Sequence, residues 1–134
     1  MISHTREKRT ISHVRNLESP EIHVAERAER MLIRYYAGCS VPYLLPICGS
    51  ENPVARFRAV WILGKSWSPA AYDTILILCG DLDDRVRYDA VLALGNLGDH
   101  RAVPELMAMA LEDDPNVPAR SALKLLGWTG VDDD

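Results

Sequence analysis

Apolar residues recur along the chain at the spacing of one helix face, and the whole pattern repeats after 31 residues. One stripe, spaced i, i+4, i+5, i+8, consists of Ala55, Ala59, Val60 and Leu63, repeated as Val86, Ala90, Val91 and Leu94. A second stripe, spaced i, i+3, i+4, i+7, consists of Val41, Leu44, Leu45 and Cys48, then Tyr72, Ile75, Leu76 and Cys79, then Val103, Leu106, Met107 and Ala110. These spacings indicate amphipathic helices rather than strands. Each unit is therefore predicted to be a helical hairpin, with an A helix followed by a B helix.

Helix boundary signals occur at matching places in the units. The candidate N-caps of the A helices are Asn52, Asp83 and Asp114, with Pro53 and Pro115 at the first helical position. Ser40, Ser68 and Asp99 are expected to cap the B helices, and Pro46 to kink or end the first of them. Gly64, Gly95 and Gly127 are predicted to end A helices in the left-handed conformation. The resulting map has a lone helix at 3–17, A helices near 20–36, 53–64, 84–95 and 115–127, and B helices near 41–49, 69–80 and 100–112.

A single hairpin cannot bury its apolar stripe, so neighbouring units must stack and share one continuous core. The sequence therefore predicts an all-α fold, a short right-handed α-α superhelix of the armadillo-like type. We expect one domain over residues 1–134. It consists of a half-repeat at 3–17, repeats at about 20–49, 51–80 and 83–112, and a terminal helix at 115–127.

Composition and charge narrow the classes of function. With 134 residues, 48% apolar and 25% charged, the chain has the make-up of a globular domain. The net charge is −4, and residues 1–16 form its one short basic segment, which argues against a dedicated nucleic-acid binder. No stretch has the length of a membrane span, and the N-terminus lacks the apolar run of a secretory signal, so a cytoplasmic location is expected.

Cysteine and histidine spacing gives no sign of a metal or cofactor site. The three cysteines form no close Cys-x-x-Cys pair, and Cys48 and Cys79 share one repeat position, which predicts core thiols. Cys39 lies outside the repeat register. The four histidines are scattered without ligand spacing. We therefore expect no metal and no cofactor.

Two segments carry a resemblance to a known family. DDRVRYDAVLALGNLGDHRAVPELMAMALED, which begins at Asp83, and NPVARFRAVWILGKS, which begins at Asn52, resemble the HEAT-like repeats named after the phycobilisome lyases. The resemblance covers about residues 20–128 and implies a HEAT-like solenoid. Proteins with this repeat include bilin lyases, a di-iron hydroxylase, DNA glycosylases and plain adaptor modules, so the fold does not fix the function.

The enzymatic branches of that family can be compared with the residues present. The hydroxylase branch uses His-Glu pairs as iron ligands, and no histidine here precedes a glutamate. The glycosylase branch needs a basic groove, whereas Arg101 is the only cation on the B helices from Val41 to Glu112. Bilin lyases are longer chains. We therefore expect no enzymatic activity, and keep a lyase-like or chromophore-handling protein, with Cys39 as its reactive thiol, as the alternative.

The outward positions of the B helices form the main candidate binding surface, because solenoids of this kind bind partners on their concave side. These positions are Tyr43, Pro46, Ile47, Thr74, Ile77, Leu78, Glu105, Ala108 and Met109. The row is largely apolar and is expected to form a groove for a peptide or a protein. In an alternative register, shifted by one position, Ile47, Leu78 and Met109 belong to the core.

The tryptophans are the second group of candidate binding residues, because the repeats do not share a tryptophan at any one position. Trp61, Trp67 and Trp128 do not occupy a common core position, and tryptophan is frequent at interface hot spots. The alternative is that they pack over hairpin loops. Arg56 and Arg87 are interpreted as structural partners of nearby acids.

Together these features predict a non-catalytic protein-interaction or scaffold module whose partner is another protein or peptide, bound on the concave B-helix face. A polar Glu29 stands where later units have apolar residues, as in a capping helix. A homodimer through an uncovered end at Leu123, Leu125 and Trp128 is a further expectation. Nucleic-acid binding through residues 1–16 is the third interpretation.

Overall fold

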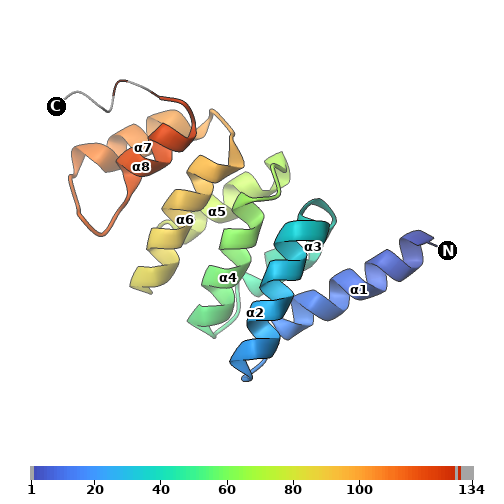
Figure 1. Cartoon of the computed structure of the whole chain (residues 1–134). Coiled ribbons are helices and arrows are strands. Elements are labelled where there is room, and N and C mark those ends of the chain that lie inside the picture. Colours follow the sequence, from blue (N-terminus) through green and yellow to red (C-terminus); the bar gives the residue numbers. More distant parts are fainter. Residues whose placement is uncertain (1, 129, 131–134) are drawn as a thin grey trace.

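The computed structural model describes residues 2–128 and residue 130, and this part of the chain is helical with short connections. The elements are α1 (Ile2–Asn16), α2 (Ile22–Met31), the π-helical segment η1 (Leu32–Tyr36), α3 (Ala37–Ile47), α4 (Pro53–Gly64), the 3-10 turn η2 (Pro69–Ala71), α5 (Tyr72–Leu78), α6 (Asp84–Leu97), α7 (Ala102–Leu111) and α8 (Ala119–Leu125). They form an elongated stack in which successive hairpins lie side by side (Figure 1). The prediction of an α-helical solenoid is confirmed.

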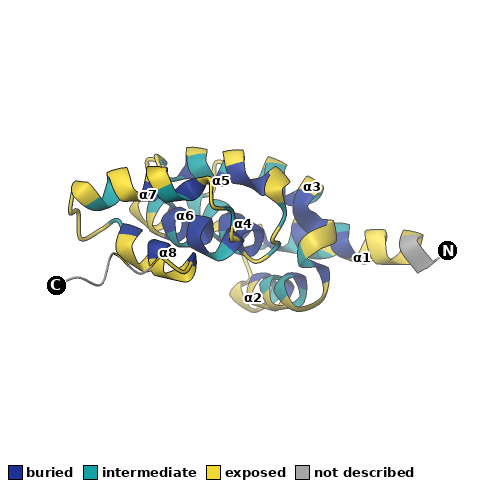
Figure 2. Ribbon diagram, turned by 90° about the horizontal axis from the view of Figure 1, so that it is seen from above, coloured by how far each residue is buried: buried dark blue, intermediate teal, exposed yellow. Residues whose placement is uncertain are grey.

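The helices lie in two rows, which Figure 2 shows along opposite edges of the molecule. The A row consists of α2, α4, α6 and α8, and the B row of α3, α5 and α7. Helix α1 packs against α2 and α3 at the N-terminal end. In the same view α2 and α8 extend farther from the B row than α4 and α6, which lie between them.

Equivalent hydrogen bonds recur 31 residues apart and confirm the structural interpretation of the two arginines. Arg56 Nη1 donates to the Ser50 carbonyl at 2.8 Å, and Arg87 Nη1 donates to the Asp81 carbonyl at the same distance. The Asp81 carboxylate also accepts hydrogen bonds from Nε and Nη2 of Arg56, at 3.0 and 2.9 Å. These arginines hold each A helix against the turn that precedes it.

The predicted caps of α4 and α6 are confirmed. Asn52 Oδ1 accepts the amide of Val54 at 3.0 Å, and Asp83 Oδ1 accepts the amides of Arg85 and Val86 at 2.9 and 3.1 Å. Each cap satisfies amides that have no partner within the first turn of the helix.

Two of the three glycines predicted to end A helices have a different role. Gly64 is the last residue of α4 and Gly95 lies inside α6, and neither has a positive φ. They are sites of close helix approach, since a Cβ on Gly64 would lie 2.8 Å from Cα of Ala93. The left-handed residue after α6 is Gly98, with φ +79°. Gly127, with φ +84°, lies in the predicted conformation.

Other boundaries differ from the prediction at the two ends of the chain. The expected break near residues 37–40 is absent, because η1 connects α2 directly to α3 and Ser40 lies within α3, where it donates to the Ala37 carbonyl. Helix α3 ends at Ile47, one residue after Pro46. Helix α8 begins at Ala119 rather than near residue 115. Pro118 explains the late start, because a proline disfavours helical geometry in the residue before it.

The core follows the predicted stripes with two corrections. Leu44, Ile75 and Leu106, at one repeat position, are fully buried. Met107 was predicted to be in the core and is 42% exposed, whereas Leu78 was assigned to the outward face and is buried. The shifted-register alternative is thus correct for Leu78. None of the helices in the described part is long and apolar enough to cross a membrane.

Candidate functional site

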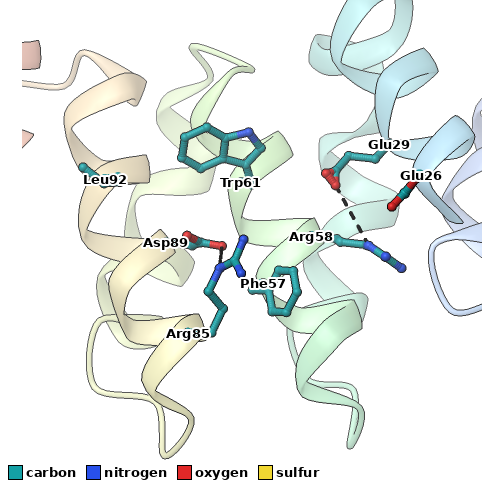
Figure 3. Close-up of a pocket in the computed structure, with 8 residues that line it drawn as sticks. All are labelled: Glu26, Glu29, Phe57, Arg58, Trp61, Arg85, Asp89 and Leu92. Carbon is teal, nitrogen blue, oxygen red and sulfur yellow. Dashed lines mark hydrogen bonds and ion pairs between the residues drawn. The ribbon is translucent and has the colours of Figure 1, made fainter. Parts of the chain in front are cut away.

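A pocket of about 410 Å³ lies on the A row and draws side chains from three successive A helices, α2, α4 and α6. The lining residues, drawn in Figure 3, are Glu26, Glu29, Phe57, Arg58, Trp61, Arg85, Asp89 and Leu92. We call this pocket the A-row groove. Since three separate hairpins contribute these residues, the groove exists only when the hairpins are stacked.

Two aromatic rings of α4 stand in the middle of the groove. Phe57 and Trp61 are four residues apart and share one helix face. Cations of the chain lie against both rings. The guanidinium carbon of Arg85 is 4.5 Å from the centre of the Phe57 ring, and Nζ of Lys65 is 4.9 Å from the centre of the Trp61 ring. Both distances fall within the range of cation–π attraction.

The α6 side of the groove holds a buried carboxylate. Asp89 is only 7% exposed and accepts a hydrogen bond from Nε of Arg85 at 3.0 Å. Burial raises the pKa of Asp89, and the hydrogen bond and charge of Arg85 oppose that shift without cancelling it. The ionised form of this carboxylate therefore lowers the stability of the fold, and one exposed arginine is its counter-ion.

The α2 side carries a similar but looser pair. Arg58, a buried residue of α4, has its Nε 4.0 Å from Oε1 of Glu29. Burial raises the pKa of Glu29, Arg58 lowers it, and the nearby charges of Asp89 and Glu26 raise it further. Glu29 was predicted to belong to a polar capping face; instead it is half-buried and lines the groove.

The lining therefore combines two aromatic rings with three carboxylates and two guanidinium groups. Aromatic and arginine side chains of this kind form the centre of many protein interfaces. Within the described residues no group of three or more histidine, cysteine, aspartate or glutamate side chains could hold a metal ion.

The residues predicted as binding sites are distributed over several surfaces. Trp61 lines the A-row groove. Tyr43 and Ile47 line a pocket of about 250 Å³ between α1 and α3, and the Tyr43 hydroxyl donates to Glu7 of α1. Trp128 lines a third pocket, of about 280 Å³, with Met107 and other apolar residues of α7 and α8.

The remaining predicted residues belong to the B-row helices α5 and α7, and Met109 among them packs partly against the core. Ile77 is 74% exposed, Glu105 and Ala108 are exposed, and Thr74 and Met109 are half-buried. The structure thus brings Tyr43 and Ile47 together and places Trp61 and Trp128 in separate pockets.

Sequence reasoning missed most of the A-row groove, although one signal was available. Arg58 and Asp89 stand 31 residues apart, at one repeat position, as do Trp61 and Leu92. Equivalent positions of adjacent A helices face the same side of a solenoid, so an Arg and an Asp at this position could have indicated a charged groove.

The raised pKa values of Asp89 and Glu29 predict a pH-dependent stability difference. A carboxyl with a raised pKa binds its proton more tightly in the folded state, so its destabilising effect is present at pH 7 and is relieved as the pH falls through the folded pKa. We expect the Asp89→Asn/Glu29→Gln double variant to gain stability relative to the parent at pH 7, and to lose that advantage progressively as the pH falls toward the ordinary carboxyl pKa of about 4. Urea denaturation of both proteins at each pH measures this difference.

The comparison between two proteins at each pH removes the opposing effect of His13. Burial and Arg27 lower the pKa of this histidine, so its protonation destabilises the fold in parent and variant alike. A difference between the two proteins that stays constant from pH 7 to about pH 4 would contradict the prediction.

Comparison with known proteins identifies the repeat that builds the fold. The family model described as HEAT repeats matches residues 17–127, which is well over half of the chain. The match runs from the end of α1 through the whole of α8 and includes every helix that lines the A-row groove. No curated protein matches the chain. With its stacked hairpins and this match, the chain belongs to the HEAT-repeat family.

Proposed function

We propose that this HEAT-repeat chain is a protein-interaction module that binds a segment of another protein in the A-row groove. One observation carries the proposal: a pocket of about 410 Å³ in which three successive A helices present aromatic rings and buried charges. Arg58 and Asp89 are both buried, so packing holds them before any partner arrives. Such preorganisation leaves most of the ordering cost of association to the partner.

The B row is the alternative binding surface within the same function. Its support is the exposure of Ile77, at 74%, on the outer face of α5. The apolar pocket around Trp128 supports a different arrangement, association of two copies through the C-terminal end. We favour the A-row groove because it alone of these three surfaces combines aromatic rings with buried charged side chains.

A lyase-like activity has less support. Burial raises the pKa of both Cys48 and Cys79 to about 12, so these thiols are poor nucleophiles. Cys39 is exposed, and its Sγ lies 3.5 Å from the hydroxyl of Thr10, away from the A-row groove. Membership of the phycobilisome-lyase branch therefore stays a hypothesis that rests on the sequence resemblance.

Site-specific photocrosslinking distinguishes the three surfaces. A benzoylphenylalanine residue replaces Trp61, Ile77 or Trp128, one at a time, and each protein is irradiated in an extract of the source cells. We expect a discrete crosslinked protein from position 61 and none from position 77. Crosslinking from position 77 without position 61 would assign binding to the B row and overturn the proposal. A product of twice the chain mass from position 128 alone would replace it with self-association.

A further inference from the structure

The side chain of Arg85 occupies part of the A-row groove, where it contacts an aromatic ring and a carboxylate. Its side chain is 64% exposed, yet its guanidinium lies against the Phe57 ring and donates a hydrogen bond to Asp89 (Figure 3). Phe57 belongs to α4 and Asp89 to α6, so the arginine bridges two hairpins. Because most of this side chain remains in solvent, packing does not fix it in place.

The contact between Arg85 and Asp89 is incomplete. Arg85 lies four residues before Asp89 on the same helix, and the hydrogen bond reaches Oδ2 through Nε. A guanidinium that arrives from outside the helix is free to approach a carboxylate with two parallel N–H groups, which is the stronger arrangement. Its planar shape also suits stacking on an aromatic ring better than an ammonium does.

The charge of the groove favours a cation as well. With Arg85 displaced, Glu26, Glu29 and Asp89 supply three carboxylates against the guanidinium of Arg58 and the ammonium of Lys65, which lies on the Trp61 ring. Asp89 is then a buried carboxylate without its hydrogen-bonded counter-ion. A buried charge in that condition strongly favours a new cationic partner.

We propose that the A-row groove recognises an arginine side chain of the partner protein at Asp89 and Phe57, and that Arg85 is the chain's own occupant of this subsite, displaced on binding. The inference rests on the proposed function and names the chemistry of its partner.

A second arginine of the chain provides a matched control. Arg101 lies 4.2 Å from the centre of the Tyr72 ring and donates through Nε and Nη2 to Asp99. The same three kinds of side chain meet there, outside the A-row groove. Hydrogen bonds from Arg101 lower the pKa of Asp99, whereas burial raises that of Asp89. The Asp99 carboxylate therefore already has a favourable cationic partner and is not expected to bind another guanidinium.

The probe is N-acetyl-arginine methylamide, titrated into the labelled full chain and followed by NMR at the Trp61 indole N–H. We expect Arg85→Ala to bind the probe about five- to tenfold more tightly than the parent, because the internal competitor is gone. Arg101→Ala should bind like the parent. Phe57→Leu and Asp89→Asn, each in the Arg85→Ala background, should lose the gain, and the leucine variant keeps an apolar side chain at position 57. The glutamine analogue should cause no saturable shift.

An unchanged affinity in Arg85→Ala, or equal binding of the glutamine analogue, would overturn the arginine subsite. That failure is distinguishable from failure of the proposed function. If position 61 still crosslinks a protein and the yield is the same in Arg85→Ala, the groove binds a partner by other contacts. Saturable binding of the arginine probe without any crosslink would support the subsite and remove the protein partner.

Discussion

Gly95→Ala is expected to lower the free energy of unfolding by about 2–3 kcal/mol, because the added methyl group has no space between α6 and α8. A Cβ at this position would lie 2.5 Å from the carbonyl oxygen of Ala122 and 2.8 Å from its Cα. Both neighbours are backbone atoms, which cannot rotate away as the end of a long side chain would. The two helices must therefore separate along their contact. Urea denaturation followed by circular dichroism measures the loss.

Gly38→Ala is the matched control and should have the opposite sign. Gly38 lies within α3, is exposed, and has no heavy atom within 4 Å of its ideal Cβ position. Alanine in an exposed helix interior is more stable than glycine by about 0.5–1 kcal/mol, because the unfolded chain has less freedom to lose. A Gly95→Ala protein as stable as the parent would show that α6 and α8 do not pack at this separation.

The close approach at Gly64 also positions the A-row groove. Gly64 and Ala93 hold α4 and α6 together, and these helices carry Phe57 and Trp61 on one side and Asp89 on the other. The distance between ring and carboxylate depends on this small residue at the end of α4. A small residue that is not part of the groove lining thus helps to set whether one guanidinium can reach both the Phe57 ring and the Asp89 carboxylate.

Sequence periodicity predicted the repeating framework well because its signals are local. A cap such as Asn52 acts on an amide two residues away, and Arg56 acts on a carbonyl six residues away. Such contacts fall within one unit, so the 31-residue shift reproduces them in the next unit. The core stripe follows the same logic, and Leu44, Ile75 and Leu106 are buried as predicted.

Features that depend on the neighbouring unit were harder to predict. Gly95 follows an apolar stripe, which is the pattern of a helix cap, but its role is set by Ala122 of another helix. The same limit applies to Arg58 and Asp89, which occupy one repeat position on neighbouring A helices. They became a groove only when α2, α4 and α6 were placed side by side. The expected B-row groove was predicted from the apolar outward residues of the B helices and from the concave face that such folds use for binding.

Leu123→Ala is expected to cost about 3 kcal/mol and to unfold the C-terminal end before the rest of the chain. Leu123 is fully buried, and α8 packs on both α6 and α7. In a solenoid each unit contacts only its neighbours, so a cavity in the last helix acts mainly on α7 and α8. Hydrogen exchange followed by mass spectrometry should show lost protection over those two helices, with α4 still protected.

The A-row groove provides the functional side of the same prediction. Its lining residues belong to α2, α4 and α6, so Leu123→Ala should still bind the arginine probe in the Arg85→Ala background. Leu125→Ala is the control on the same helix. That side chain is 52% exposed, and its loss should change the stability by less than about 0.5 kcal/mol. Equal loss of protection in α4 and α8 of the Leu123→Ala protein would show instead that the solenoid unfolds as one cooperative unit, in which damage at the C-terminal end also opens the groove.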